Sequence, residues 1–153
     1  MILVDSNIII DFWKHPTEEM KEVFATGDVV ICGVVRSEIL HGAVSQENLD
    51  RLSKLLNAFD IVSIKDDQWD GFGRYLYKLK TNGLTVPYQD ALISYIAVQN
   101  NVKVWTWDKH FKLFSIPTVL KEIIFEESKR IHKPRKPCVS GVFLCIKITH
   151  CER

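Results

Sequence analysis

Four acidic residues are the main candidates for chemistry, because each lies where an apolar segment of the sequence meets a polar one. Asp5 and Asp108 each follow an apolar run of the kind that forms a buried strand. Glu38 lies in a helical segment after another such run, and Asp90 lies in the first turn of a later helix. Ligands of parallel sheets bind at the carboxyl ends of the strands, and right-handed crossovers carry helices over that edge. We therefore expect the four carboxylates to converge.

Carboxylates that converge repel one another, which raises their pKa values unless a cation lies between them. Magnesium and manganese ions prefer oxygen ligands, and the sequence offers no histidine or cysteine at the spacing of a zinc site. The predicted cofactor is therefore Mg²⁺ or Mn²⁺. Such a site can lower the pKa of a water molecule, direct it at a phosphodiester and relieve repulsion between the acids and an RNA backbone.

Each of these acids also has a purely structural explanation. Asp5 could form a turn or cap a helix, and Asp108 could cap a segment at residues 109–114. Asp90 could simply complement a helix dipole. Glu38 is the most informative of the four, since it stands among apolar residues of its helix. We interpret the other aspartates as turn or surface residues: Asp11, Asp28, Asp60, Asp66, Asp67 and Asp70.

Short apolar runs alternate with amphipathic stretches along most of the chain. Strands are expected at residues 2–4, 28–32, 61–64 and 102–106. Helices are expected at residues 17–27, 34–43, 46–59, 66–80 and 88–99, with a short helix or turn at 8–13. This alternation is typical of an α/β sandwich with a mainly parallel sheet.

The composition supports a single folded domain and excludes few functions. The chain has 153 residues, of which 46% are hydrophobic, and this is ordinary for one globular domain. No apolar run is long enough for a transmembrane helix, and the first residues do not resemble a signal peptide, so we expect a cytoplasmic protein without a membrane partner. The net charge of +1 provides no basic surface that would by itself indicate nucleic-acid binding.

The last part of the chain differs in character from the rest. A basic, proline-interrupted stretch at residues 129–137 precedes a segment that contains three of the four cysteines. The basic stretch could contact RNA phosphates or be a solvated tail. The cysteines Cys138, Cys145 and Cys151 lack the usual spacing of a zinc site. We predict a nuclease domain at residues 1–127 and an appendage at residues 128–153.

Four segments of the sequence resemble the PIN domain family, and within it the VapC-type toxins of toxin–antitoxin pairs. They are VDSNIIIDFW around Asp5, RSEILHG around Glu38, YQDALISYIA around Asp90 and TWDKHF around Asp108. The resemblance covers roughly residues 1–120. It implies a three-layer α/β/α sandwich with a central, mainly parallel sheet.

The resemblance also implies roles for particular residues. Asp5, Glu38, Asp90 and Asp108 match the family's acidic, metal-binding quartet. Asn7 and Thr106 match accessory polar positions that support the metal ligands or the attacking water. The implied activity is metal-dependent endoribonuclease cleavage that leaves a 3′-hydroxyl and a 5′-phosphate. The implied partners are RNA, a cognate antitoxin that blocks the groove, and a second copy of the chain.

Several other side chains could take part in RNA binding. Trp107 could stack on a base or pack in the interior. The aromatic residues of two helices are better explained by core packing or a dimer face: Trp69, Phe72, Tyr75, Tyr77 and Tyr95. Five basic residues could contact phosphates, although each is more simply a surface charge: Arg36, His41, Arg74, Lys109 and His110.

Three alternatives to a nuclease remain open. A phosphatase of the haloacid dehalogenase type also has an Asp after its first strand, but it needs a second acid where this chain has Asn7. A receiver-type signalling domain needs an acidic pair, which Asp5 and Ser6 do not supply. A catalytically silent PIN-like binding module is disfavoured only by the presence of the complete set of acids.

Overall fold

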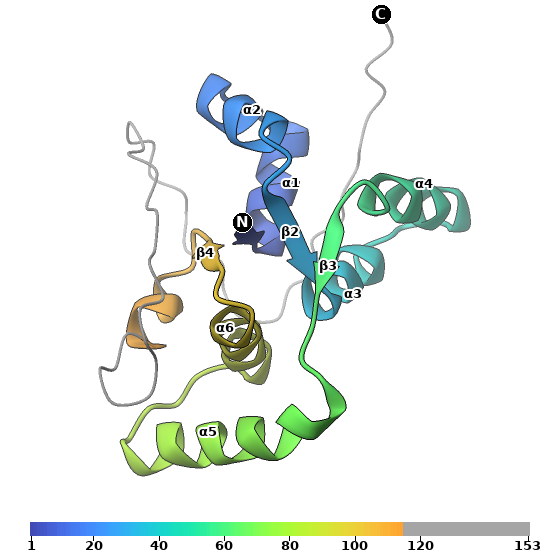
Figure 1. Cartoon of the computed structure of the whole chain (residues 1–153). Helices are drawn as coiled ribbons and strands as arrows, with labels where there is room; N and C mark the ends of the chain where they lie inside the picture. The colour runs from blue at the N-terminus through green and yellow to red at the C-terminus, as the bar shows by residue number, and fades with distance from the viewer. Residues whose placement is uncertain (115–153) are drawn as a thin grey trace, which may run out of the picture.

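The computed structural model describes residues 1–114, which form a parallel four-stranded sheet with helices on both faces (Figure 1). The strands are β1 (Ile2–Val4), β2 (Val29–Cys32), β3 (Asp60–Val62) and β4 (Lys103–Trp105), in the order β3-β2-β1-β4. In the centre, Leu3 pairs with Val30 on one side and with Val104 on the other. The prediction of a mainly parallel sheet is confirmed, since every pair of neighbouring strands in this sheet is parallel.

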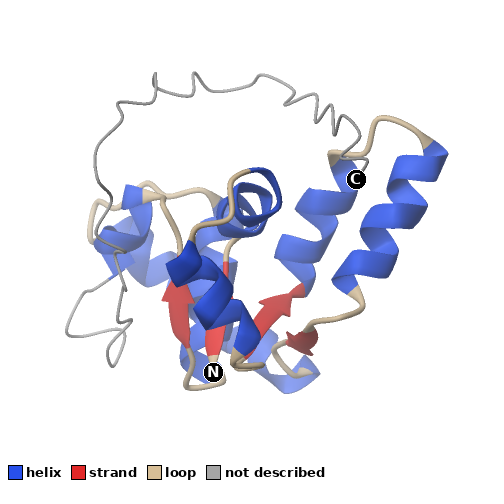
Figure 2. Ribbon diagram, turned by 90° about the horizontal axis from the view of Figure 1, so that it is seen from above, coloured by secondary structure: helices blue, strands red, loops and turns tan. Residues whose placement is uncertain are grey.

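Helices cover both faces of this sheet and complete the predicted three-layer sandwich (Figure 2). They are α1 (Ser6–Lys14), α2 (Glu18–Ala25), α3 (Gly33–His41), α4 (Gln46–Leu56), α5 (Trp69–Thr81) and α6 (Tyr88–Gln99). Two short 3₁₀ segments, η1 (Asp66–Gln68) and η2 (Lys109–Phe114), precede α5 and follow β4. Helix α6 is buried along most of its length, as expected for a segment with apolar residues on all sides.

Polar side chains at the helix starts explain where several helices begin. The Thr17 side chain accepts a hydrogen bond from the backbone N–H of Met20, and Ser45 does the same for Asn48. Asp5 caps α1 in the same way, through the N–H of Ser6. The segment after Asp5 is therefore a complete helix of nine residues, longer than the short helix or turn expected at residues 8–13.

The third strand differs from its prediction. A strand was expected at residues 61–64, whereas β3 begins at Asp60 and ends at Val62; it is the sheet's edge strand, and Ile61 is 53% exposed. Helix α4 ends just before it, at Leu56. An edge strand has a neighbour on one side only, so an apolar sequence does not guarantee its burial.

The aromatic residues of α5 and α6 divide into two groups. Phe72, Tyr75 and Tyr95 are buried and pack against one another, with ring centroids 5.4–6.4 Å apart. Core packing is thus confirmed for these three. Tyr77 and Trp69 remain largely exposed on the surface of α5.

The predicted domain boundary at residue 127 and the appendage at residues 128–153 lie outside the described residues. Within residues 1–114, no helix has the length and apolar character needed to cross a membrane.

Candidate metal centre

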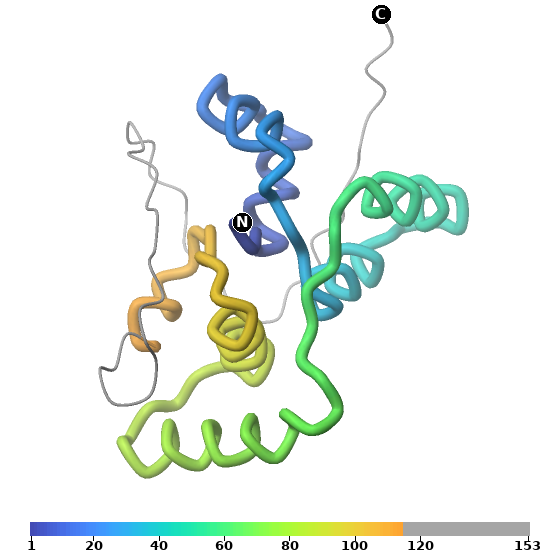
Figure 3. The backbone as a smooth tube through the Cα atoms, viewed as in Figure 1, coloured from blue at the N-terminus to red at the C-terminus, as the bar shows by residue number. Residues whose placement is uncertain are grey.

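Asp5 directly follows β1, at the carboxyl end of that strand, and β1 pairs with β4. The segment after β4, orange in Figure 3, lies beside α6. The backbone N–H of Asp5 donates to the carbonyl of Trp105 at 2.9 Å, which ties the end of β1 to β4. The side chain is 7% exposed, and its Oδ1 accepts a hydrogen bond from the N–H of Ser6 at 2.7 Å. Its Oδ2 accepts from Asn7 Nδ2 at 2.7 Å and from Thr106 Oγ1 at 2.6 Å. Asp5 is therefore a helix cap and also a carboxylate held in a fixed orientation.

Asn7 and Thr106 form a network that joins the two strand ends. Asn7 Nδ2 also donates to Thr106 Oγ1 at 3.2 Å, and its Oδ1 accepts from the backbone N–H of Trp107 at 3.2 Å. The N–H of Asp108 donates to Thr106 Oγ1 at 2.9 Å. Through these bonds the two predicted accessory residues connect the loop that carries Asp108 with Asp5.

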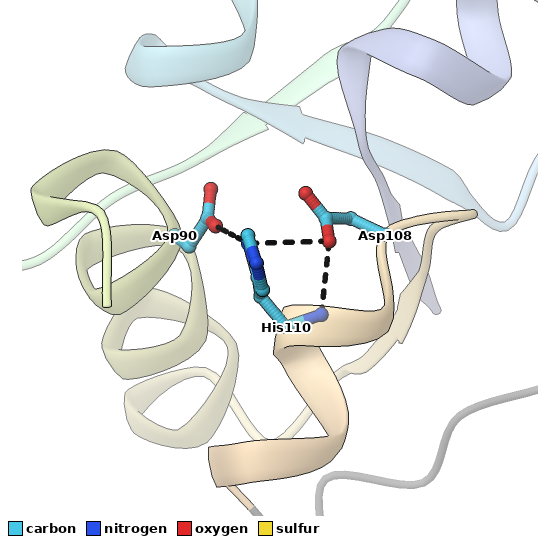
Figure 4. A group of neighbouring side chains, drawn as sticks. All are labelled: Asp90, Asp108 and His110. Atoms are coloured by element: carbon cyan, nitrogen blue, oxygen red, sulfur yellow. Dashed lines mark hydrogen bonds and ion pairs between the residues drawn. The ribbon is translucent and has the colours of Figure 1, made fainter. Parts of the chain in front are cut away.

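Asp90, Asp108 and His110 form a compact cluster beside this network (Figure 4). Asp90 comes from the first turn of α6, whereas Asp108 and His110 come from the turn after β4 and the start of η2. His110 Nδ1 lies 3.4 Å from Asp108 Oδ1 and 3.6 Å from Asp90 Oδ2. One possible ligand atom from each residue lies within 4.8 Å of the others. The sequence has no histidine at the spacing of a zinc site, and His110 joins this cluster only through the fold.

The backbone of η2 determines the position of His110. Phe111 and Phe114 of this segment are completely buried, and their rings pack edge to face with centroids 5.5 Å apart. The N–H of His110 donates to Asp108 Oδ1 at 2.9 Å. The sequence alone gave no indication of this, because nothing in it shows which way the turn after Asp108 is anchored.

Glu38 approaches the other carboxylates from α3, where its side chain is half-buried. Burial raises the pKa of Glu38, the negative charges of Asp5 and Asp90 raise it further, and a hydrogen bond with Ser6 opposes the shift. Sequence reasoning did not single out Ser6. The only available signal was its place directly after Asp5, at the first position of α1.

The structure brings the predicted acids to one region of the fold, to different degrees. Asp90 and Asp108 lie in the same cluster, within 4.8 Å. Asp5 is tied to the loop of Asp108 through Thr106, which donates to Asp5 Oδ2 and accepts from the N–H of Asp108. Burial raises the pKa of Asp5 and that of Asp90, the latter to about 6, and the charge of Asp108 adds to both shifts. Glu38 lies outside the cluster but near enough to Asp5 and Asp90 for their charges to raise its pKa.

The residues present fit a divalent cation. Asp90 Oδ2 is buried and has no hydrogen-bond partner among the described residues, so it has an acceptor lone pair to offer. The surrounding donor set is dominated by carboxylate oxygens, which hard divalent ions prefer. A cation at this place would also offset the repulsion that raises the pKa values of these acids.

The other side chains that were considered for RNA contacts are spread over several parts of the fold. Arg36 bridges α3 and α4 through Asn57 Oδ1 at 2.9 Å and Ser53 Oγ at 3.4 Å. Its guanidinium therefore has a structural role. Lys109 is exposed directly beside Asp108, while His41 is exposed at the end of α3 and Arg74 on α5. Trp107 is partly buried and packs edge to face against Trp105, with ring centroids 6.3 Å apart.

Asp11 is buried, although it was interpreted from the sequence as a turn or surface residue. Its side chain is only 8% exposed within α1. Its position in the helix places it on the same side as Ile8, which is completely buried. A short apolar stretch does not reveal the rotation of its helix, so the interpretation of Asp11 was wrong.

Replacing Asp90 with asparagine is expected to stabilise the metal-free protein at pH 7.5. Folding raises the pKa of Asp90 from 3.8 to about 6. The contribution of this one group to stability is therefore most favourable below about pH 4. This stability is lost as the pH rises through 6, and asparagine avoids the loss. The side chain is 16% exposed and partly screened, so we expect a gain of about 1–2 kcal/mol in the free energy of unfolding.

Thermal unfolding in EDTA, with the wild type and the Asp90→Asn variant at several pH values, measures this effect. The advantage of the variant should be constant above about pH 7 and should shrink as the pH falls from about 6 to 4. A variant that is less stable than the wild type at pH 7.5 would show that the buried Asp90 carboxylate is not a cost of folding.

Comparison with known proteins agrees with the fold. The sequence model of the PIN domain family matches residues 2–116. Ribonuclease VapC1 of Methanocaldococcus jannaschii is 27% identical over 112 residues, which cover 72% of this chain and 79% of that protein.

Solved structures show the same architecture. VapBC2 from Rickettsia felis, bound to a DNA fragment from its promoter, aligns with a TM-score of 0.64 and 24% identity, covering 80% of this chain and 98% of that one. A toxin–antitoxin complex from Klebsiella pneumoniae aligns with a TM-score of 0.57 and 25% identity, covering 79% and 97%. Since the family match extends over most of the sequence, this chain belongs to the PIN domain family and is a distant homologue of the VapC toxin ribonucleases.

Proposed function

We propose that this protein is a metal-dependent endoribonuclease whose cation is held by Asp5, Asp90 and Asp108, with Glu38 as the fourth acid of the site. The observation that carries the proposal is that acids from distant segments of the chain meet in one region. Asp90 and Asp108 share a cluster of possible metal ligands, and Asp5 is hydrogen-bonded through Thr106 to the loop of Asp108. Such an arrangement costs stability in the absence of a cation, and it suits Mg²⁺ or Mn²⁺. The distant relationship to a protein named ribonuclease supports the choice of substrate.

The side chains of the site have separate tasks in this proposal. When bound, the divalent cation supplies the acidity that turns water into a nucleophile and the charge that neutralises the phosphodiester. Ser6, Asn7 and Thr106 hold the Asp5 carboxylate in one orientation through hydrogen bonds. Burial and the charges of Asp5 and Asp90 raise the pKa of Glu38, which makes it a better proton acceptor than an exposed glutamate.

Removal of divalent cations is expected to abolish cleavage. The full chain, purified without added metal, should cut a structured RNA when Mg²⁺ or Mn²⁺ is present and should lose this activity in EDTA. Re-addition of excess metal should restore it, since the site itself remains folded. Analysis of the product ends should give 3′-hydroxyl and 5′-phosphate groups. RNA cleavage that continues in EDTA, with a rate equal to that of the metal-containing sample, would contradict the proposed mechanism.

The same experiment separates the alternatives. Release of phosphate from small monoesters without RNA cleavage would support a phosphatase, although the PIN family match and the amide at Asn7 disfavour one. Binding of RNA without cleavage under any metal would support a catalytically silent module. Each of these results would replace the proposed function.

We further propose that this nuclease is the toxin of a toxin–antitoxin pair and works as a homodimer in the cytoplasm. The Klebsiella pneumoniae structure of similar fold and 25% identity is a toxin–antitoxin complex. An antitoxin would block access of RNA to the acids. Expression of the chain alone should arrest bacterial growth, and co-expression of its cognate antitoxin should relieve the arrest.

A further inference from the structure

His110 is the only described side chain other than a carboxylate in the cluster of possible metal ligands. Figure 4 shows its imidazole ring between the carboxyl groups of Asp90 and Asp108. The Nδ1 atom lies 3.4 Å from Asp108 Oδ1 and 3.6 Å from Asp90 Oδ2. The ring is thus close to both acids at once, although it comes from a segment that follows the last strand.

These separations place three possible ligand atoms around a common space. With metal–ligand distances of about 2.1 Å, neighbouring ligand atoms of an octahedral ion are about 3.0 Å apart and opposite ones about 4.2 Å apart. The observed 3.4 Å and 3.6 Å are longer than an octahedral edge, and the possible ligand atoms of the three residues all lie within 4.8 Å of one another. The three side chains would therefore have to move closer together to hold one ion.

The fold positions this ring without restricting it. The backbone of His110 is fixed by its N–H, which donates to Asp108 Oδ1 at 2.9 Å, and by the burial of Phe111. The side chain itself is 57% exposed, so it can turn by a small amount without disturbing the core. In addition, Asp90 Oδ2 is buried, and its neighbour among the described residues is His110 Nδ1, 3.6 Å away, so an ion between the two would take both as ligands.

We propose that His110 provides a nitrogen ligand to the metal centre and that the site therefore prefers Mn²⁺ to Mg²⁺. This inference rests on the metal site of the proposed function and specifies its metal. Magnesium binds almost entirely through oxygen, whereas first-row transition metals also accept imidazole nitrogen. A site with one imidazole among its carboxylates consequently gains more from Mn²⁺ than from Mg²⁺.

A simpler explanation makes the opposite prediction. If His110 were only a surface cation that pairs with Asp90 and Asp108, it would compete with the metal for the same oxygens. Its removal would then leave Mn²⁺ affinity unchanged or increase it. The sign of the effect of a His110→Ala variant therefore distinguishes a ligand from a competing cation.

The first measurement is a titration of the full, untagged, metal-stripped chain with Mn²⁺, in which electron paramagnetic resonance reports the free ion. The His110→Ala variant should bind Mn²⁺ at least about tenfold more weakly than the wild type. Competition with Mg²⁺ should show that Mg²⁺ affinity changes by less than about threefold, because magnesium gains little from the nitrogen. His15→Ala is the matched control, since His15 is exposed at the far end of α1, and it should bind Mn²⁺ like the wild type.

The second measurement identifies the ligand directly. Pulsed electron paramagnetic resonance of the bound Mn²⁺ should show modulation from a coordinated ¹⁴N nucleus in the wild type and in His15→Ala, and none in His110→Ala. Absence of this modulation in the wild type, or equal Mn²⁺ affinity in wild type and His110→Ala, would overturn the nitrogen ligand. RNA cleavage that persists alongside such a result would leave the proposed nuclease intact. Failure of the wild type to bind Mn²⁺ at all would overturn both proposals.

Discussion

An Asp5→Asn variant is expected to lose RNA cleavage by a factor of about a hundred to a thousand while remaining folded. The carboxylate lies at the meeting point of β1 and β4, and asparagine has nearly the same shape but no charge to hold a cation. Loss of a cation that neutralises a reacting phosphodiester costs several kcal/mol of transition-state stabilisation, which corresponds to rate effects of this size. Initial rates of RNA cleavage at saturating Mn²⁺ and at pH 7.5 measure the loss.

This substitution also separates the two roles of Asp5. Asparagine is as good a helix cap as aspartate, so the start of α1 should be preserved and circular dichroism should not change. Asp60→Asn, at an exposed position of the edge strand β3, is the matched control and should cleave at the wild-type rate. An Asp5→Asn variant that keeps its activity within about threefold of the wild type would reduce Asp5 to a structural residue.

Replacement of Thr106 by valine is expected to have the next largest effect. The hydroxyl of Thr106 donates to Asp5 Oδ2 at 2.6 Å and accepts the N–H of Asp108 at 2.9 Å, and valine has the same shape without either capacity. Groups that orient metal ligands typically contribute about 10- to 100-fold to metal affinity or activity. We expect a loss of cleavage in this range and a loss of about 1–3 kcal/mol in the free energy of unfolding, because a buried N–H loses its partner.

Thr106→Ser provides the control, since serine restores the hydroxyl and gives up only a methyl group. It should keep cleavage within about threefold of the wild type. The discriminating quantity is Mn²⁺ affinity, measured by titration on folded protein at a temperature well below unfolding. A valine variant that loses stability but keeps both Mn²⁺ affinity and cleavage would show that Thr106 only ties the strands together.

The sequence predicts the architecture because the alternation of apolar runs and amphipathic stretches reflects local physics. Strand ends could be placed from the change of apolar to polar residues after Val4 and near Thr106, within one residue of the end of β4 at Trp105. Because the strands are parallel, their carboxyl ends lie at one edge of the sheet, and the acids that directly follow them lie at that same edge. The convergence of Asp5 and Asp108 is therefore a consequence of topology.

Side-chain direction is what the sequence does not reveal. The burial of Asp11 depends on how α1 is rotated against the sheet, and the apolar residues at positions 8, 9 and 10 do not fix that rotation. The position of His110 depends on how Phe111 and Phe114 anchor η2 below it. Both features arise from packing between elements that are distant in the chain, which single-sequence patterns do not encode.

The hydrogen bond between Asp5 and Thr106 joins residues that are 101 positions apart. During synthesis the first of these leaves the ribosome early, whereas the second follows only after nearly the whole described fold has been made. A nascent chain that ends before β4 consequently contains Asp5 but lacks Asp108 and the hydrogen bonds of Asp5 with Trp105 and Thr106. If the chain is the nuclease proposed above, translation products that end before β4 should therefore be unable to cleave RNA, because they lack Asp108 and the hydrogen-bond partner of Asp5.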